Sequence, residues 1–114
     1  MLVNSEECKE LRRLSEIMRG GTDVVNEYRL SETESGFPCL AVLIKGDIAA
    51  VTYFPDDGHA GYTAAGSGDF REFADFGMYE IHGDMVISAD KAASLAEEFF
   101  LTGKKPCGTE WTEL

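Results

Sequence analysis

Basic residues are scarce in this chain of 114 residues, which has ten lysines and arginines against 21 aspartates and glutamates. Its formal net charge is therefore −11 at pH 7. Nucleic acids and anionic membrane surfaces are negatively charged, so this excess disfavours both as partners and favours a basic partner. The alternative interpretation of the same charge is a surface that is merely soluble.

Cysteine and histidine, the residue types that hold most zinc ions, are also few. The three cysteines are odd in number and form no C-x-x-C pair, which disfavours a disulfide framework or a structural zinc site and favours reduced thiols in the cytosol. The two histidines do not have the H-x-x-x-H or H-E-x-x-H spacing of metal sites. We therefore expect no metal and no cofactor. The residues concerned are Cys8, Cys39, Cys107, His59 and His82.

Long hydrophobic runs are absent as well. The longest apolar run is about six residues, whereas a membrane-spanning helix needs about 20. The N-terminal stretch MLVNSEECKE has neither the basic region nor the apolar region of a signal peptide. We therefore expect a cytoplasmic protein with no membrane partner.

The chain contains only part of one catalytic signature. Pro106-Cys107-Gly108-Thr109 resembles half of the zinc-deaminase motif, but the second cysteine is missing. The other half, H-x-E, is missing too, because the residue two positions after His82 is Asp84. We therefore expect no enzymatic activity. A small enzyme that uses His82, Asp84 and Cys107 in a cleft is the alternative.

Loops that bind phosphate or calcium are not indicated either. The glycines of GYTAAGSGDF, residues 61–70, follow neither the Walker nor the Rossmann spacing, and no lysine follows them. The acidic pair Asp56-Asp57 lacks the residue order of a calcium-binding loop. These segments are more typical of solvated loops.

Two segments do have the apolar spacing of amphipathic helices. The first covers residues 5–19 and the second covers residues 89–102. Each is flanked by residues that favour helix ends. These caps and stops are, in chain order, Asn4 or Ser5, Gly20-Gly21, Ser88 and Gly103.

Strand patterns lie between the two helices. The clearest are residues 39–45 and 48–54, joined by Gly46-Asp47, a two-residue turn with glycine first as type II′ turns prefer. The order of helix, strands and helix predicts a single α+β domain over residues 1–114, in which an N-terminal and a C-terminal helix pack against an antiparallel β-sheet. Weaker strand patterns cover residues 25–32, 61–65, 78–82 and 85–87.

Acidic and aromatic residues alternate between residues 56 and 84. This segment has seven acids and one base, a net charge of −6. Aromatic side chains supply buried contact area and carboxylates pair with lysine and arginine, so the combination suits a surface that binds a basic protein. Alternatively, Phe70, Phe73 and Phe76 pack in the core and the acids only solvate the loops. The predicted contact residues are Asp56, Asp57, Tyr62, Asp69, Glu72, Asp75, Tyr79 and Glu80.

Several short stretches in a fixed order resemble immunity proteins that neutralise secreted cytosine-deaminase toxins acting on DNA. The resemblance runs from about Glu34 to Leu114 and is weak over the first helix and over residues 56–80. We expect Gly36, Phe37 and Pro38 to be structural. The matching stretches are Glu34-Ser-Gly-Phe-Pro38, Asp47-Ile48-Ala49 with Val51 and Tyr53, Glu98-Phe99-Phe100, and Trp111-Thr112-Glu113-Leu114.

The resemblance implies a non-enzymatic antitoxin of the producing cell's cytoplasm, which binds its toxin domain one-to-one and covers the active site. The charge agrees, because a deaminase that acts on DNA needs a basic groove that an acidic protein would fill. The weak match over residues 56–80 leaves open whether the toxin acts on DNA, acts on RNA or is nuclease-like. An immunity or adaptor protein for an unrelated basic partner is the alternative.

Overall fold

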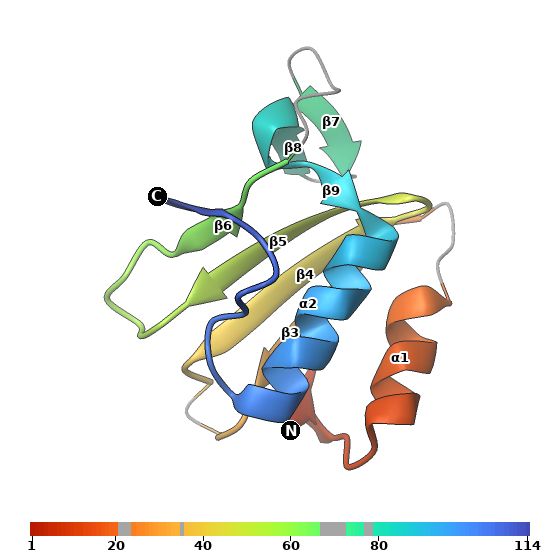
Figure 1. Ribbon diagram of the computed structural model, residues 1–114, viewed down its shortest axis with the longest axis vertical. Coiled ribbons are helices and arrows are strands. Elements are labelled where there is room, and N and C mark those ends of the chain that lie inside the picture. The colour runs from red at the N-terminus through yellow and green to blue at the C-terminus, as the bar shows by residue number, and fades with distance from the viewer. Residues whose placement is uncertain (21–23, 35, 67–72, 77–78) are drawn as a thin grey trace.

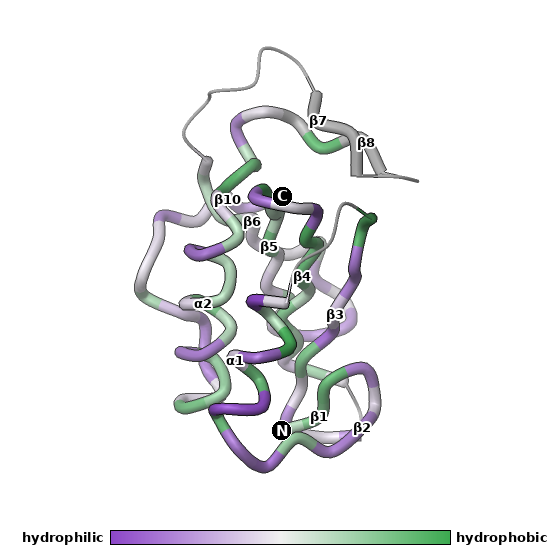
Figure 2. Tube along the Cα trace, turned by 90° about the vertical axis from the view of Figure 1, so that its right-hand side faces the viewer, coloured by the Kyte–Doolittle hydropathy of each residue, from purple (hydrophilic) through white to green (hydrophobic). Residues whose placement is uncertain are grey.

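The computed structural model describes residues 1–20, 24–34, 36–66, 73–76 and 79–114, with the backbone alone for residues 73–76, 79, 80 and 82 (Figure 1). Helices α1 (Leu11–Arg19) and α2 (Ala89–Thr102) lie side by side on one face of a β-sheet. Figure 2, turned by 90°, shows both helices on one side of the strands. This arrangement confirms the predicted α+β fold.

The main sheet has eight strands within the described residues, and every pairing in it is antiparallel. The strand order is β10-β6-β5-β4-β3-β1-β2, and β9 pairs with β5, so β10 and β2 form the two edges. The strands are β1 (Leu2–Val3), β2 (Glu6–Glu7), β3 (Asn26–Ser31), β4 (Cys39–Lys45), β5 (Ile48–Phe54), β6 (Tyr62–Ala64), β9 (Ile87–Ser88) and β10 (Trp111–Glu113).

A separate two-stranded hairpin, β7 (Phe73–Phe76) and β8 (Tyr79–His82), lies beyond the end of the main sheet. Strand β7 lies against β4 of the main sheet. The hairpin's second strand matches the prediction for residues 78–82, whereas its first strand was not predicted. The hypothesis that Phe70, Phe73 and Phe76 pack in the core concerns side chains outside those described.

The central hairpin has the predicted bounds. Strands β4 and β5 pair along their whole length, and Lys45 opposes Ile48 across the turn. Gly46 has a positive φ of 58°, whereas Asp47 does not, as expected for a turn of type II′. The glycine is needed here because it adopts a positive φ without steric cost.

The core fills the space between the sheet and the two helices. Leu40, Val42 and Ile44 point from β4 into it and are at most 1% exposed, as their alternation predicts. Leu95 and Phe99 from α2 meet them, and burying each such side chain stabilises the fold by about 1.5–3 kcal/mol. The hydrophobic effect of this one layer therefore accounts for the placement of both helices.

A smaller apolar cluster covers part of the opposite face of the sheet. Its buried member is Val86, and Leu43 from β4 and Ile81 from β8 pack against it. The central strands are therefore covered in part on both faces. The cluster also anchors the β7–β8 hairpin to the main sheet.

Helix α2 has both predicted ends. The Ser88 hydroxyl accepts a hydrogen bond from the Lys91 N–H (3.1 Å), which caps the start. Gly103 adopts the left-handed conformation with φ 66°, and its N–H donates to the Phe99 carbonyl (2.7 Å). Glycine is favoured at position 103 because any other residue would be strained at this positive φ; a Cβ there would meet only the flexible end of the Glu32 side chain.

The predicted start of the first helix was wrong. Asn4 and Ser5 do not cap a helix but form the left-handed turn between β1 and β2, with φ of 51° and 70°. The Asn4 amide bonds to β3 instead: its Oδ1 accepts from the Arg29 N–H (2.8 Å) and its Nδ2 donates to the Glu27 carbonyl (3.1 Å). Strand pairing therefore outweighs the local capping preference, and α1 begins at Leu11.

The strand before α2 also differs from its prediction. Residues 83–85 form a 3-10 helix, and the strand that was expected over residues 85–87 is reduced to β9. The C-terminal tail forms β10, in which Trp111 packs against the core. The Trp111 indole N–H donates to the Pro106 carbonyl (2.7 Å), so this hydrogen bond connects β10 to the segment that follows α2. Neither described helix is long and apolar enough to cross a membrane.

Candidate functional site

The loop between β5 and β6 carries two of the predicted contact residues. Asp56 and Asp57 follow β5 after a single residue, Pro55, and both side chains are exposed. The Asp56 carboxylate accepts a hydrogen bond from the Gly58 N–H (2.9 Å), which shapes the turn that displays the pair. Two adjacent negative charges are thus held at the tip of a short loop between paired strands.

Tyr62, the third predicted contact residue with a described side chain, lies at the start of β6. The His59 ring stacks on the Tyr62 ring, with centroids 4.9 Å apart and an interplanar angle of 18°. The ammonium group of Lys105, which follows α2, lies 4.2 Å from the centroid of the same ring. Tyr62 therefore already has an aromatic contact and a cation contact within its own chain.

Glu113 on the edge strand β10 completes this group, because it directly opposes Tyr62 in the sheet register. Its Oε2 lies 3.2 Å from His59 Nε2. The His59 Nδ1 accepts from the Gly61 N–H (2.8 Å), so Nε2 carries the proton that is donated to Glu113. A hydrogen bond with the Glu113 carboxylate and the charge of that carboxylate raise the pKa of Tyr62.

We call these four residues, His59, Tyr62, Lys105 and Glu113, the Tyr62 platform. Loop, strand, post-helix segment and edge strand each supply one member. An aromatic face beside carboxylates attracts ammonium and guanidinium groups, which is the chemistry of cation–π recognition. Tyr62 was predicted as a contact residue, whereas its three neighbours were not. His59 and Glu113 did lie in stretches that the sequence pattern had singled out, residues 56–84 and Trp111–Leu114.

The other predicted contact residues lie elsewhere. Asp75 opposes Glu80 in the β7–β8 hairpin, and Tyr79 opposes Phe76. Along the chain, Asp56 and Asp57 come before β6, and the β7–β8 hairpin comes after it. Figure 1 shows the β5–β6 loop and this hairpin at different places in the molecule, so the candidates form two groups. Asp69 and Glu72 lie outside the described residues. Whether any of these residues contacts a partner stays a prediction.

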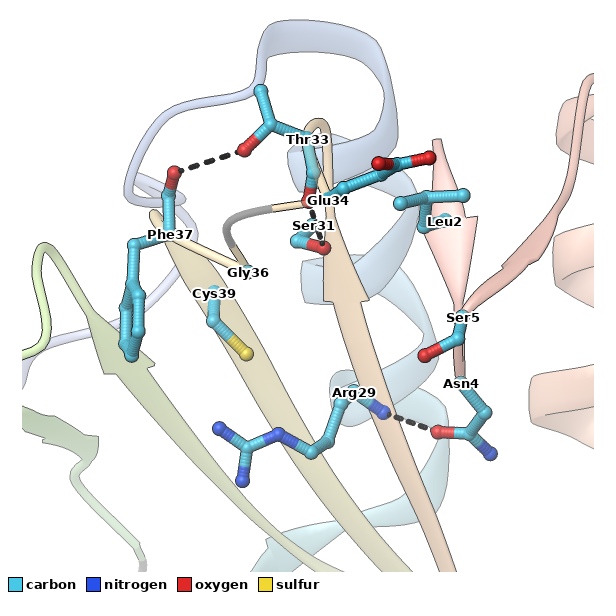
Figure 3. Close-up of a pocket in the computed structure, with 10 residues that line it drawn as sticks. All are labelled: Leu2, Asn4, Ser5, Arg29, Ser31, Thr33, Glu34, Gly36, Phe37 and Cys39. Carbon is cyan, nitrogen blue, oxygen red and sulfur yellow. Dashed lines mark hydrogen bonds between the residues drawn. The ribbon is translucent and has the colours of Figure 1, made fainter.

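A pocket of about 570 Å³ lies beside the ESGFP stretch, and the sequence analysis missed it (Figure 3). Arg29 and Glu34 contribute opposite charges to its lining, and Phe37 forms one wall. The thiol of Cys39 lies between them, and burial raises its pKa while the nearby Arg29 charge partly opposes that rise. A thiol in this state is a weak nucleophile, so the lining resembles a binding pocket more than a catalytic one.

The residues of the alternative enzyme hypothesis are only partly described. Asp84 lies in the 3-10 helix after β8, and Cys107 is exposed in the segment after α2. The Cys107 backbone N–H donates to the Glu98 carboxylate (2.5 Å). The side chain of His82 is outside those described, so this alternative stays a prediction. The described residues contain no group of three or more histidine, cysteine or acidic side chains placed to hold a metal ion.

The fold and the composition together define a small acidic α+β protein. No family model matches the chain. It is 35% identical over 94 residues to the double-stranded DNA deaminase immunity protein of Burkholderia cenocepacia (strain H111), an alignment that covers 78% of this chain and 76% of that protein. The chain therefore belongs to the family of double-stranded DNA deaminase immunity proteins, which confirms the resemblance noted in its sequence.

Proposed function

We propose that this protein is an immunity protein that binds a cognate deaminase toxin in a one-to-one complex and blocks its active site. The observation that carries the proposal is the 35% identity, across most of both chains, to a deaminase immunity protein. On this proposal the protein is not an enzyme. It acts in the cytoplasm of the producing cell, where the toxin would otherwise reach the chromosome.

Electrostatics support such an inhibitor. A deaminase that acts on nucleic acid has to hold phosphate groups, so its substrate groove is basic. A chain with a net charge of −11 is attracted to that groove over a distance, and steering of this kind raises association rates by about 10- to 1,000-fold. Rapid capture matters because each free toxin molecule acts many times.

The predicted contact residues suit the same partner. Asp56 and Asp57 present carboxylates at a loop tip, where they would replace the phosphates of the nucleic acid. Asp75 and Glu80 occupy opposed positions in the β7–β8 register, and we propose both as further contacts for a basic partner. We propose the same role for Asp69, Glu72 and Tyr79 on the strength of the sequence pattern alone.

A titration of toxin activity tests the proposed function. A candidate deaminase domain acts on a DNA duplex while the protein is added from zero to two equivalents. We expect deamination to fall linearly and to stop at one equivalent, because a tight one-to-one inhibitor removes one active site per molecule.

Two controls make the titration specific. An unrelated acidic protein of similar net charge should leave deamination unchanged at the same concentrations, and raising the DNA concentration should not restore activity at one equivalent. Full turnover with excess protein would exclude the assignment to that toxin.

A further inference from the structure

The position of Lys105 in the free protein is unusual for so acidic a chain. The chain has 21 carboxylate side chains, yet the Lys105 ammonium lies over the Tyr62 ring, 4.2 Å from its centroid. Among the residues that the structure describes, no carboxylate lies within ion-pair distance of it. The face of the Tyr62 ring therefore binds a cation in the free protein.

The ring that receives the ammonium is held in position before any partner arrives. His59 stacks on it, Glu113 lies within hydrogen-bond distance of His59 and opposes Tyr62 in the β6–β10 register, and that register fixes the backbone around them. Because the platform is already ordered, binding of a cation there costs little conformational entropy. The Glu113 carboxylate, which opposes Tyr62 in the sheet, adds attraction for the same charge.

The Lys105 side chain can be displaced from the Tyr62 ring by a partner. It lies in an exposed segment after α2, and its long, flexible side chain keeps a strongly hydrated ammonium group. A guanidinium group is planar and less hydrated, so it stacks more favourably on an aromatic ring. An arginine from a partner would therefore replace the lysine at a net gain.

We infer that the Tyr62 platform is a docking site for an arginine of the toxin, and that Lys105 occupies this site until the toxin displaces it. The inference rests on the proposed function, which supplies a partner with a basic groove. Lys105 then acts as an internal competitor that weakens binding.

Two neighbouring lysines provide a matched test. Lys105→Ala and Lys104→Ala remove the same charge from the same exposed segment, but only Lys105 contacts the ring. Lys105→Ala removes a competitor whose contact with the ring is one exposed cation–π interaction. It should therefore bind the toxin domain that the protein inhibits about two- to five-fold more tightly than Lys104→Ala does. Equal dissociation constants, or weaker binding by Lys105→Ala, would overturn the inference.

A third variant ties the effect to the ring. Tyr62→Leu removes the aromatic face, so the difference between Lys105→Ala and Lys104→Ala should disappear in that background. A difference that persists without the ring would contradict the role of the platform. Tyr62→Phe keeps the face and should keep the difference, which separates loss of the ring from loss of the hydroxyl.

The displacement can be observed directly by NMR. In the free protein the ring should shift the Lys105 ε-methylene resonance upfield, and the resonance should return to the position of Lys104 when the toxin domain binds. A shift that persists in the complex would overturn the inference and leave the proposed function standing. Failure of the toxin domain to bind at all would remove the proposed function, and the inference with it.

Discussion

At the scale of single residues, Asp56 and Asp57 are the predicted contacts whose side chains the structure shows as exposed. Only Pro55 separates them from the end of β5, so a paired strand holds their loop at its base. Their charges act on a partner before contact, because opposite charges steer association. Substitutions here should therefore change the rate of association more than the stability of the fold.

The first prediction concerns this acidic pair. Asp56→Lys with Asp57→Lys changes the net charge from −11 to −7 and should slow association with the toxin domain about tenfold, because both the local and the total attraction fall. Stopped-flow kinetics at low salt measures the rate. The control, Glu6→Lys with Glu16→Lys, makes the same change in net charge elsewhere. An equal slowing by the control would show that net charge alone matters.

The second prediction concerns the ionisation of Tyr62. Hydrogen bonding with Glu113 and its charge raise the pKa of the Tyr62 hydroxyl above the ordinary value of 10.0, so the neutral phenol is favoured in the folded protein. Its contribution to stability is present below pH 10 and declines as the pH rises above that value. The Tyr62 ring carbon shifts measured against pH should show the raised midpoint.

Glu113→Gln is the matched variant for that titration. It keeps a hydrogen-bond acceptor beside the hydroxyl but removes the charge, so the pKa of Tyr62 should move back toward its ordinary value. An unchanged midpoint in Glu113→Gln would mean that the carboxylate is not the cause.

At the scale of elements, the two helices are joined by polar contacts as well as by the core. Arg19 at the end of α1 bonds to Asp90 (3.1 Å) and Glu97 (2.8 Å) of α2, and the Ser15 hydroxyl donates to Glu97 (2.6 Å). These contacts fix the relative position of helices that are far apart in sequence.

The third prediction measures that connection. Arg19→Ala should lower the free energy of unfolding by about 0.5–1 kcal/mol, a small value because the guanidinium is partly exposed and solvent screens it. Urea denaturation provides the measurement. Arg12→Ala is the control, since its contact with Glu10 spans 3.9 Å between exposed side chains and should contribute about nothing. A larger loss for Arg12→Ala would contradict this assignment.

The fourth prediction compares the two faces of β4. Leu40 is fully buried under the helices, so Leu40→Ala should destabilise the protein by about 2–5 kcal/mol through lost burial and a cavity. Leu43 is half-buried on the other face, so Leu43→Ala should cost clearly less. Equal losses in chemical denaturation would mean that the smaller cluster around Val86 supports the fold as strongly as the main core.

Sequence patterns predicted elements well where a segment is long enough to carry its own signal. The β4–β5 hairpin and α2 have the expected bounds, because alternation, glycine turns and caps are local properties. Some short strands, among them β7 and β10, were missed for the opposite reason, although β6 and β8 were predicted. The β7 and β10 strands have four and three residues, and their pairing depends on partners brought by the fold.

At the scale of the whole molecule, the net charge of −11 acts on any basic partner. The fifth prediction is that association with the toxin domain slows steeply between about 0.01 M and 0.15 M salt, as the Debye length falls from about 30 Å to about 8 Å. Dissociation should change much less, since contacts at short range are screened less. An association rate independent of salt would contradict electrostatic capture.

Only part of the candidate site could be predicted from composition. Asp56, Asp57 and Tyr62 were predicted because acids and aromatics alternate in one segment. Lys105 and Glu113 lie more than 40 positions beyond Tyr62 in sequence, and nothing local connects them to it. They were missed because only the β6–β10 register and the path of the chain after α2 bring them to the ring.

The amino-acid sequence by itself determined the charge, the α+β class, the central hairpin and the family resemblance, because each depends on composition, local periodicity or the order of short stretches. Tertiary structure alone decided where the first helix begins, that the tail becomes an edge strand, and which residues surround Tyr62. These outcomes depend on pairing between distant segments: the backbone groups and side chains of Asn4 and Glu113 bond to strands that other parts of the chain supply. Such contacts form only when burial of the common core brings those strands together.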